Sequence, residues 1–253
     1  MEIKKNDVFL TTIEDMSDDG AGIGKTNGYT WFIKDTVIGD VVEAAAMKMK
    51  KSYGYGRLIR VVEPSAARVE PACPVARQCG GCQLQAMSYE EQLRFKANRV
   101  YHNLVRIGKF KDLVRADGEA GAEESRAAGT VKSETGDPKG GAAVGAAAGE
   151  PGAMAEKTAG AVFLPIMGME NPWRYRNKAQ FPIGADRQGN PVAGFYASRT
   201  HDITPVQDCL LGVDQNRIVL DAVLSYMRDC QIPPYDETTG NGLIRHLLIR
   251  YGF

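Results

Sequence analysis

The N-terminal part of the chain carries short apolar bursts separated by polar, glycine-containing turns, the pattern of a small β-barrel. Valine, isoleucine and aromatic residues recur in four bursts, at 8–10, 29–33, 41–42 and 58–62. Turn residues stand between them at Asp18-Asp19-Gly20 and at Asn27-Gly28. Barrels of the OB type are built from such strands and commonly bind single-stranded nucleic acid. We therefore predict an OB-like barrel over residues 1–63.

A helix is predicted after residue 88, because apolar residues then recur at three- and four-residue spacing. Ser88 and Glu91 have the spacing of a capping box, and Gly108 is placed to end the helix. The apolar stripe consists of Leu93, Ala97, Val100, Tyr101, Leu104 and Ile107. Residues 64–115 are thus predicted as a cysteine-containing loop followed by this helix.

Residues 116–161 interrupt this pattern. Of these 46 residues, 24 are alanine or glycine, and no aromatic residue occurs between Phe110 and Phe163. Such a stretch buries too little apolar surface to offset its conformational entropy. We predict a disordered Ala/Gly-rich insert here.

The remaining residues, 162–253, are predicted to form an α+β domain. Two strands are expected at 175–183 and 192–196, joined by a turn at 186–190. Asp214 is expected to cap a second helix, whose buried side is Ile218, Val219, Ala222, Val223 and Tyr226. The segment 243–251 resembles a strand with no partner after it, so we expect this domain to be truncated at its C-terminus. The predicted fold class is β-rich α+β.

Composition places the chain among ordinary globular proteins. It is 43% hydrophobic and 25% charged, and it has no apolar run of membrane-spanning length and no signal-peptide core. We therefore expect a cytoplasmic protein that contacts no membrane. Thiols stay reduced in that compartment, so clustered cysteines favour metal binding over disulfides.

A net charge of zero conceals a marked asymmetry. Residues 1–43 carry four basic and nine acidic side chains, whereas residues 44–110 carry twelve basic and four acidic ones. Lysines and arginines release counterions from phosphates when they bind a polyanion. The basic block therefore indicates either a polyanion partner or an ordinary solvated surface.

The most specific chemical signal is a set of four cysteines. Cys73, Cys79 and Cys82 follow the spacing C-x5-C-x2-C, and Cys209 stands far downstream. Structural zinc usually takes two close pairs, whereas an iron–sulfur cluster tolerates three neighbouring cysteines plus a distant one. Spacing alone leaves a cluster, zinc or neither open. Cys230, late in the second predicted helix, is expected to be a buried small apolar residue rather than a nucleophile.

These features together resemble the RNA uracil-5-methyltransferases. The run from Cys73 to Gln85, followed by Tyr89-Glu-Glu-Gln92 and Lys96, is similar to the iron–sulfur signature of that family. The residues before it resemble the TRAM domain, an OB-like RNA-binding barrel. The segments similar to the family's central domain are 175–179, 194–196 and 206–209.

The resemblance implies a [4Fe-4S] cluster held by Cys73, Cys79, Cys82 and Cys209. Its implied role is structural or RNA-positioning, because methyl transfer to uracil needs no electron transfer. S-adenosylmethionine is the implied methyl donor, bound in the family by a later domain that also carries the catalytic groups. We therefore assign no catalytic or S-adenosylmethionine-binding residue here.

The expected function is the RNA-recognition part of a 23S rRNA (uracil-5-)-methyltransferase, monomeric and inactive alone. The alternative is a stand-alone iron–sulfur or zinc RNA-binding protein without enzymatic activity. Cations interleaved with aromatic rings suit single-stranded RNA, because rings stack on bases while cations meet phosphates. The predicted RNA-binding residues are Lys48, Lys50, Lys51, Tyr53, Arg57, Arg174, Arg176 and Lys178.

Overall fold

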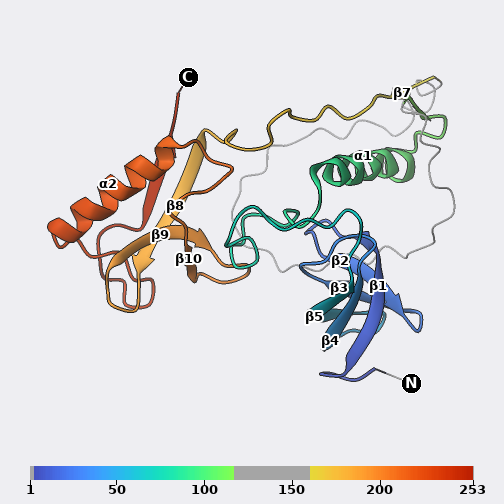
Figure 1. Cartoon of the computed structure of the whole chain (residues 1–253), viewed down its shortest axis with the longest axis horizontal. Coiled ribbons are helices and arrows are strands. Elements are labelled where there is room, and N and C mark those ends of the chain that lie inside the picture. Colours follow the sequence, from blue (N-terminus) through green and yellow to red (C-terminus); the bar gives the residue numbers. More distant parts are fainter. Residues whose placement is uncertain (1–2, 117–159, 253) are drawn as a thin grey trace, which may run out of the picture. The chain divides into compact units, whose positions relative to one another are not determined.

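The computed structural model describes residues 3–116 and 160–252. The chain divides into two compact units, one of Met1–Gln92 with Met169–Phe253 and one of Leu93–Gly168 (Figure 1). The first unit contains the predicted barrel, the cysteine loop and the C-terminal α+β part. Most of the insert predicted at 116–161 lies outside the described residues, so its predicted disorder stays a prediction.

The predicted N-terminal barrel is confirmed. Five strands close in the order β1-β2-β3-β5-β4, with β3 parallel to β5 and every other pair antiparallel. The strand bounds are Val8–Met16 for β1, Gly22–Thr26 for β2, Tyr29–Ile33 for β3, Val41–Met49 for β4 and Tyr53–Glu63 for β5. The four predicted apolar bursts all lie within these strands, because alternating residues on a closed sheet supply its core.

A single tryptophan fills the centre of this barrel. Trp31 is fully buried, and its ring stacks on Phe9 with the ring centroids 4.2 Å apart. Ile33 and Val42 are also fully buried in the same core. A Cβ added at Gly54 would lie 2.6 Å from the Trp31 ring, so glycine at this position of β5 lets the barrel close around the indole.

A buried ion pair joins the barrel to the start of the cysteine loop. Asp40, fully buried before β4, accepts hydrogen bonds from the backbone N–H groups of Val37 at 2.7 Å and Ser65 at 2.9 Å. The Arg68 guanidinium donates to the same carboxylate at 2.6 Å. Burial alone would raise the pKa of Asp40, but the hydrogen bonds from Arg68, Ser65 and Val37 outweigh it and lower the pKa.

The helix predicted after residue 88 is present as α1, Tyr89–Arg106, which begins in the first unit and continues into the second. Ser88 caps it, because its hydroxyl accepts the Glu91 N–H at 3.4 Å. Two of the six members of the apolar stripe are exposed. Ala97 is the buried residue of α1, whereas Val100 is 52% and Ile107 76% exposed among the described residues. Periodicity identifies the apolar side of a helix but not the neighbour that covers it.

The second unit also contains two short strands. They are β6, Val114–Arg115, and β7, Val162–Phe163, and they pair in parallel. Tyr101 of α1 packs edge-on against Phe163, with ring centroids 5.5 Å apart. The Arg115 guanidinium lies 5.2 Å from the centre of the Tyr101 ring. These contacts tie the two strands to the helix within the unit.

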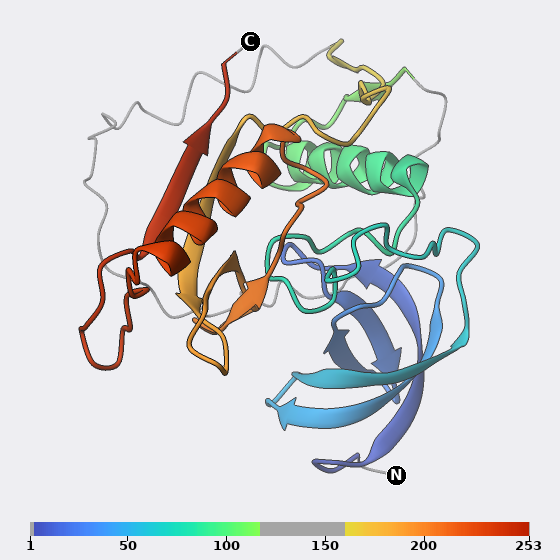
Figure 2. The same cartoon turned by 60° about the vertical axis from the view of Figure 1, so that its left-hand side comes forward.

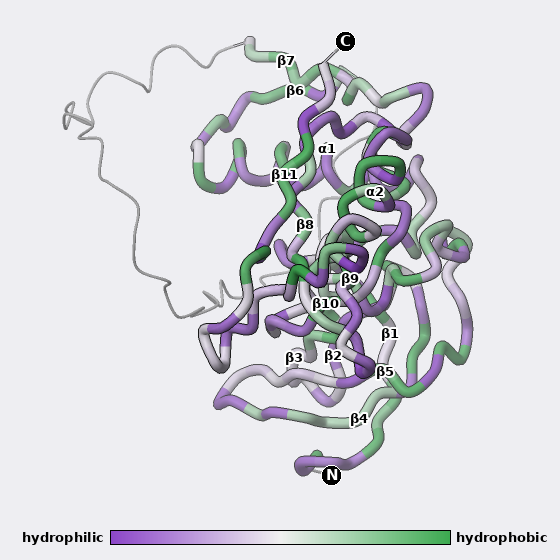
Figure 3. Tube along the Cα trace, turned by 90° about the vertical axis from the view of Figure 1, so that its left-hand side faces the viewer, coloured by the Kyte–Doolittle hydropathy of each residue, from purple (hydrophilic) through white to green (hydrophobic). Residues whose placement is uncertain are grey.

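The C-terminal part of the first unit is a four-stranded antiparallel sheet in the order β10-β9-β8-β11. The strands span Lys178–Ala185 in β8, Pro191–Tyr196 in β9, Ile203–Pro205 in β10 and His246–Arg250 in β11. The last predicted segment forms β11, which pairs with the earlier strand β8. Figure 2 shows α2, Gln215–Asp229, lying across this sheet. Figure 3 shows hydrophobic residues along α2 and β11.

The predicted buried side of α2 is wrong except for Val223, which packs against the sheet core. Ile218 is 71% and Tyr226 62% exposed, whereas Leu220 and Met227 are buried against Phe181 and its neighbours in the sheet. Two apolar stripes run along this helix, and the sheet covers the one that includes Leu220. The sequence alone does not say which stripe meets the sheet. Neither α1 nor α2 is long and apolar enough to cross a membrane, within the part of the chain that is described.

Candidate metal centre and nucleic-acid interface

The structure brings the four predicted cysteines to one cavity of about 70 Å³. Cys73, Cys79 and Cys82 reach it from the loop between β5 and α1, and Cys209 from the segment between β10 and α2. The apolar lining residues are Val75, Ala76, Phe195, Val206, Leu210 and Leu211, and Gln85 and Arg176 complete the wall with Gly81. A cavity needs roughly 10–15 Å³ to hold one water molecule, so this cavity has room for a group several times larger than a water.

The cysteine loop is held against β9 through backbone contacts. The Cys79 N–H donates to the Val75 carbonyl at 2.8 Å, and the Gly80 N–H donates to the Tyr196 carbonyl at 2.9 Å. Cys79 and Ala197 also form an isolated antiparallel bridge. A Cβ at Gly80 would lie 2.8 Å from the Tyr196 carbonyl oxygen, so only glycine fits this close approach.

Cys209 is positioned by Arg174, which had been predicted to bind RNA. Its guanidinium forms a two-pronged pair with Asp208, at 2.6 and 2.7 Å, and also donates to the carbonyl oxygens of Cys209 and Gly212, both at 3.2 Å. Hydrogen bonding with this carboxylate raises the pKa of Arg174 and lowers the pKa of Asp208. The side chain is therefore engaged in holding the Cys209 segment.

Asp214 shares this guanidinium. It stands at the N-cap of α2, as predicted, but its side chain makes no capping hydrogen bond. Its carboxylate instead lies 3.0 Å from Nε of Arg174. The predicted capping interaction is therefore wrong, because a nearby cation competes for the carboxylate.

Two of the thiols in the cavity, Cys79 and Cys82, have raised pKa values. Burial raises the pKa of Cys79 and of Cys82, and the charge that Cys209 and Cys73 would carry as thiolates raises both further. The Gly81 N–H acts in the opposite sense on Cys79, as do Gln85 and Arg176 on Cys82. Four thiolates sharing one cavity repel one another, so their joint deprotonation calls for a compensating cation.

The four cysteines share a cavity without forming a recognisable ligand set for a metal ion. Four thiolates on one zinc, each about 2.3 Å from the metal, must approach one another within about 4 Å. Among the described residues, no group of three or more cysteine, histidine or carboxylate side chains is arranged to hold one metal ion. A four-iron cluster takes one thiolate at each iron and so fits a wider set of sulfurs.

Cys230 is not part of this arrangement. It follows α2 as the C-cap residue and is exposed. The prediction of a buried apolar role is wrong for this residue. Cys230 is not among the residues that line the cavity of the other four cysteines.

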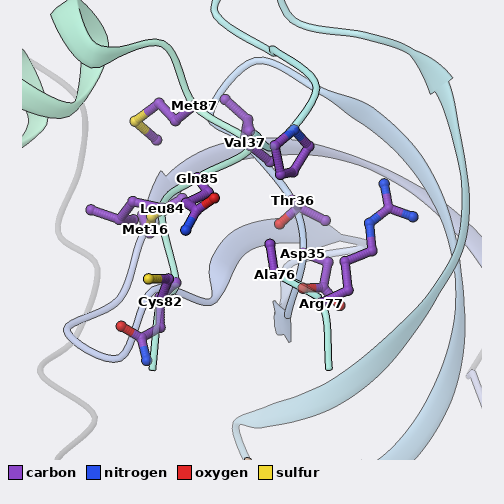
Figure 4. A pocket seen from close by; sticks show the side chains of 13 residues that line it. Met16, Asp35, Thr36, Val37, Ala76, Arg77, Cys82, Leu84, Gln85 and Met87 are labelled. Atoms are coloured by element: carbon purple, nitrogen blue, oxygen red, sulfur yellow. The ribbon is translucent and has the colours of Figure 1, made fainter. Parts of the chain in front are cut away.

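A second cavity nearby is much smaller. Figure 4 shows it between barrel residues that include Met16 and Thr36 and loop residues that include Arg77 and Leu84. Its volume is about 20 Å³. That space fits little more than one water, so this cavity is a packing seam between the barrel and the cysteine loop rather than a ligand site.

The predicted RNA-binding residues fall into two groups. The exposed cations Lys48, Lys50, Lys51 and Arg57 lie on β4, on β5 or between these strands. Tyr53 is partly buried on β5, and Lys178 is exposed at the start of β8. Arg176 lines the cysteine cavity instead.

Two residues beside this surface were not predicted. Phe32 alternates with the buried Trp31 and Ile33, so strand alternation was an available signal for its outward side chain. Arg199 approaches the barrel only through tertiary structure, for which the sequence gives no signal.

Comparison with known proteins finds a matching domain family and similar RNA methyltransferases. Residues 4–59 match the TRAM domain. Over 250 residues the chain is 38% identical to an uncharacterized RNA methyltransferase of Halalkalibacterium halodurans and 36% identical to one of Listeria monocytogenes. These alignments cover 99% and 98% of this chain but 44% of each relative, so the chain spans less than half the length of the curated relatives it matches.

A solved structure shares the fold. The Pyrococcus abyssi tRNA (uracil-54, C5)-methyltransferase, solved with S-adenosyl-L-homocysteine, superimposes with a TM-score of 0.53 at 17% sequence identity. The match covers 96% of this chain and 42% of that protein. At this identity the likeness establishes the arrangement of the chain and not its substrate.

These findings correct the expected function. Nearly the whole chain aligns with proteins named RNA methyltransferases, which overturns the alternative of a non-enzymatic binding protein. The expectation of a recognition part that is inactive alone is withdrawn on the same alignment. The structural relative is titled a transfer RNA enzyme, and nothing in the comparisons supports the restriction to 23S rRNA.

Proposed function

We propose that this chain acts in an S-adenosylmethionine-dependent RNA methyltransferase that modifies carbon 5 of uracil. The observation that carries the proposal is the alignment of 250 residues with proteins named RNA methyltransferases, at 38% identity for the Halalkalibacterium halodurans relative. The TRAM match, the cationic barrel surface and the fold shared with a uracil-C5 enzyme support it further.

In this chemistry a cysteine thiolate adds to carbon 6 of the uracil, which makes carbon 5 nucleophilic. Carbon 5 takes the methyl group from the sulfonium of S-adenosylmethionine, leaving S-adenosylhomocysteine. A base then removes the carbon 5 proton, and the thiolate is expelled as the ring recovers its double bond. We assign no residue of this chain to these steps. The target base has to leave its stack, so the enzyme must hold unpaired RNA.

The barrel of this chain would bind and orient that RNA. Exposed lysines and Arg57 on the barrel provide counter-charge for phosphates. We further propose that Cys73, Cys79, Cys82 and Cys209 hold a [4Fe-4S] cluster. The proposal is supported by the all-thiol donor set in one cavity and by the Arg176 cation in the cavity wall, which would complement an anionic centre. When bound, the cluster would tie the cysteine loop to the Cys209 segment.

Methyl transfer tests the proposed function directly. Protein expressed from the native gene is incubated with S-adenosylmethionine labelled in its methyl group and with total RNA from a strain that lacks the gene. After digestion to nucleosides, we expect the label in 5-methyluridine. RNA from the parent strain is the control and should accept little label, because its target is already methylated. Label in another nucleoside, or equal labelling of both RNAs, would refute the proposal.

A further inference from the structure

Three aromatic side chains form a continuous patch on the outside of the barrel. Phe32 of β3 lies 5.6 Å from Tyr53 and 5.8 Å from Tyr55 of β5, between ring centroids, and the two tyrosines are 5.8 Å apart. All three side chains are partly exposed, whereas their strand neighbours Trp31 and Gly54 are buried. The rings therefore present faces and edges to solvent instead of filling the core.

Strand register surrounds the patch with positive charge. Phe32 pairs with Tyr55 across β3 and β5, and Lys48 pairs with Tyr55 across β4 and β5. The row Phe32, Tyr55, Lys48 therefore runs across three adjacent strands. Arg57 follows Tyr53 and Tyr55 at two-residue spacing on β5 and is exposed. Alternation places its side chain on the same face as the two tyrosines.

Arg199, which lies outside the barrel, adds a third cation near the aromatic patch. Arg199 has a positive φ of 65°, and its guanidinium reaches Asp19 of the barrel at 3.5 Å. Its neighbour Ser198 accepts a hydrogen bond from Nζ of Lys34 at 2.7 Å, so two contacts hold this loop at the barrel. Burial and the adjacent Tyr53 raise the pKa of Tyr55, whereas the charge of Arg199 lowers it and that of Asp19 raises it. The Arg199 side chain is 65% exposed.

We propose that Phe32, Tyr53 and Tyr55 form a stacking platform for unpaired RNA bases, with Lys48, Arg57 and Arg199 meeting the adjoining phosphates. The proposal rests on the proposed function and specifies the form of RNA that this surface takes. Aromatic rings ringed by cations fit a single strand, because bases offer π-faces to the rings and phosphates need counter-charge. A protein partner would not require this alternation of rings and cations.

Removing the aromatic rings tests whether they stack on RNA bases. The double variant Phe32→Leu with Tyr55→Leu keeps apolar volume but removes two rings. Affinity for a short single-stranded RNA, followed by fluorescence anisotropy, should fall about 5- to 150-fold for each stacked base that is lost. An RNA of the same length with abasic sugars should bind the unchanged protein more weakly, yet bind the unchanged and double-variant proteins equally. Tyr226→Leu, at a 62% exposed tyrosine of α2, is the matched control and should bind as the unchanged protein does.

Arg199→Asn tests the cation outside the barrel, because asparagine tolerates the left-handed backbone at this position. Log affinity falls with log salt, and we expect this dependence to become shallower by about 0.7 in the variant. That is the value for one phosphate contact on a single strand. Arg187→Asn, at an exposed arginine in the β8–β9 turn, should leave the slope unchanged.

The outcome separates this inference from the proposed function. Unchanged affinity in the double variant, with its fold intact by circular dichroism, overturns the platform even if the protein still methylates uracil. Equal loss with the abasic RNA would also overturn it, since the rings would then support the barrel and not the bases. Base-dependent binding without methyl transfer to any RNA would leave the platform standing and refute the enzymatic proposal.

Discussion

Replacing Asp40 tests the join between the barrel and the cysteine loop. The carboxylate is fully buried, accepts two backbone N–H groups and pairs at 2.6 Å with Arg68, whose side chain is only 13% exposed. Removing one partner of a buried ion pair costs about 3–5 kcal/mol, because the other charge is left without a counter-ion. The unpaired N–H groups of Val37 and Ser65 add to this in part. We expect Asp40→Ala to lower the free energy of unfolding by about 4 kcal/mol, and Asp40→Asn, which keeps an acceptor, by about 2 kcal/mol.

Urea unfolding followed by tryptophan fluorescence provides the assay. A Trp173→Phe background leaves Trp31, at the centre of the barrel, as the only tryptophan. Glu43→Gln is the matched control, because Glu43 pairs with Arg60 at the same distance of 2.6 Å on the same barrel, but Arg60 is 63% exposed. A surface pair of this kind contributes about 0–1 kcal/mol. If Asp40→Ala costs no more than Glu43→Gln, the argument from burial is wrong.

The same pair predicts the sign of a pH effect. The pKa of Asp40 is lower in the folded protein than in the unfolded chain. Its contribution to stability is therefore complete above the unfolded value, about 3.9, and is lost as the pH falls through the lower folded value. The stability gap between the unchanged protein and Asp40→Asn should stay constant from about pH 5 to pH 8 and narrow in stronger acid. A gap that instead widens on acidification would contradict the direction of the shift.

Three further predictions concern the cysteine cavity. Protein purified without oxygen should carry about four irons and be brown, and Cys209→Ser should lower iron and acid-labile sulfide together; a colourless protein with one zinc would refute the cluster. Arg174→Met should lower iron content severalfold, measured by metal analysis, because Asp208 and the Cys209 carbonyl lose their donor; unchanged iron would show that the brace is dispensable. Gly80→Ala should displace the loop and lower iron occupancy, since its Cβ would lie 2.8 Å from a carbonyl oxygen.

Much of the local structure could be predicted from the sequence, because it depends on neighbours along the chain. Alternation placed the 29–33 burst on β3, where Trp31 and Ile33 point inward. The turn at 186–190 forms as expected, with the Asp186 carboxylate accepting the N–H of Asn190 at 2.8 Å. Ser88 caps α1 at the predicted position. In each case the deciding interaction spans at most a few residues.

The prediction errors arise where a side chain or a helix face could contact more than one partner that is distant in the sequence. Asp214 stands at an N-cap, but Arg174, forty residues earlier in the chain, takes its carboxylate. In α2 the sheet buries Leu220 and Met227, whereas the equally apolar Ile218 is exposed. Such choices depend on which groups the fold brings together, and no spacing in the sequence encodes them. For the same reason, the sequence did not predict that Arg174 holds the Cys209 segment.

The tertiary contacts also connect the cysteine cavity with the proposed stacking platform. Gly80 donates to the Tyr196 carbonyl, and Cys79 bridges Ala197, at the start of the loop that carries Arg199. Ser198 of that loop in turn accepts from Lys34 of the barrel. A cluster bound by Cys79 would therefore fix the backbone from which Arg199 reaches the platform. Because methyl transfer moves no electrons through a cluster, its loss should appear first as weaker single-stranded RNA binding with a smaller salt dependence, the same signature as Arg199→Asn.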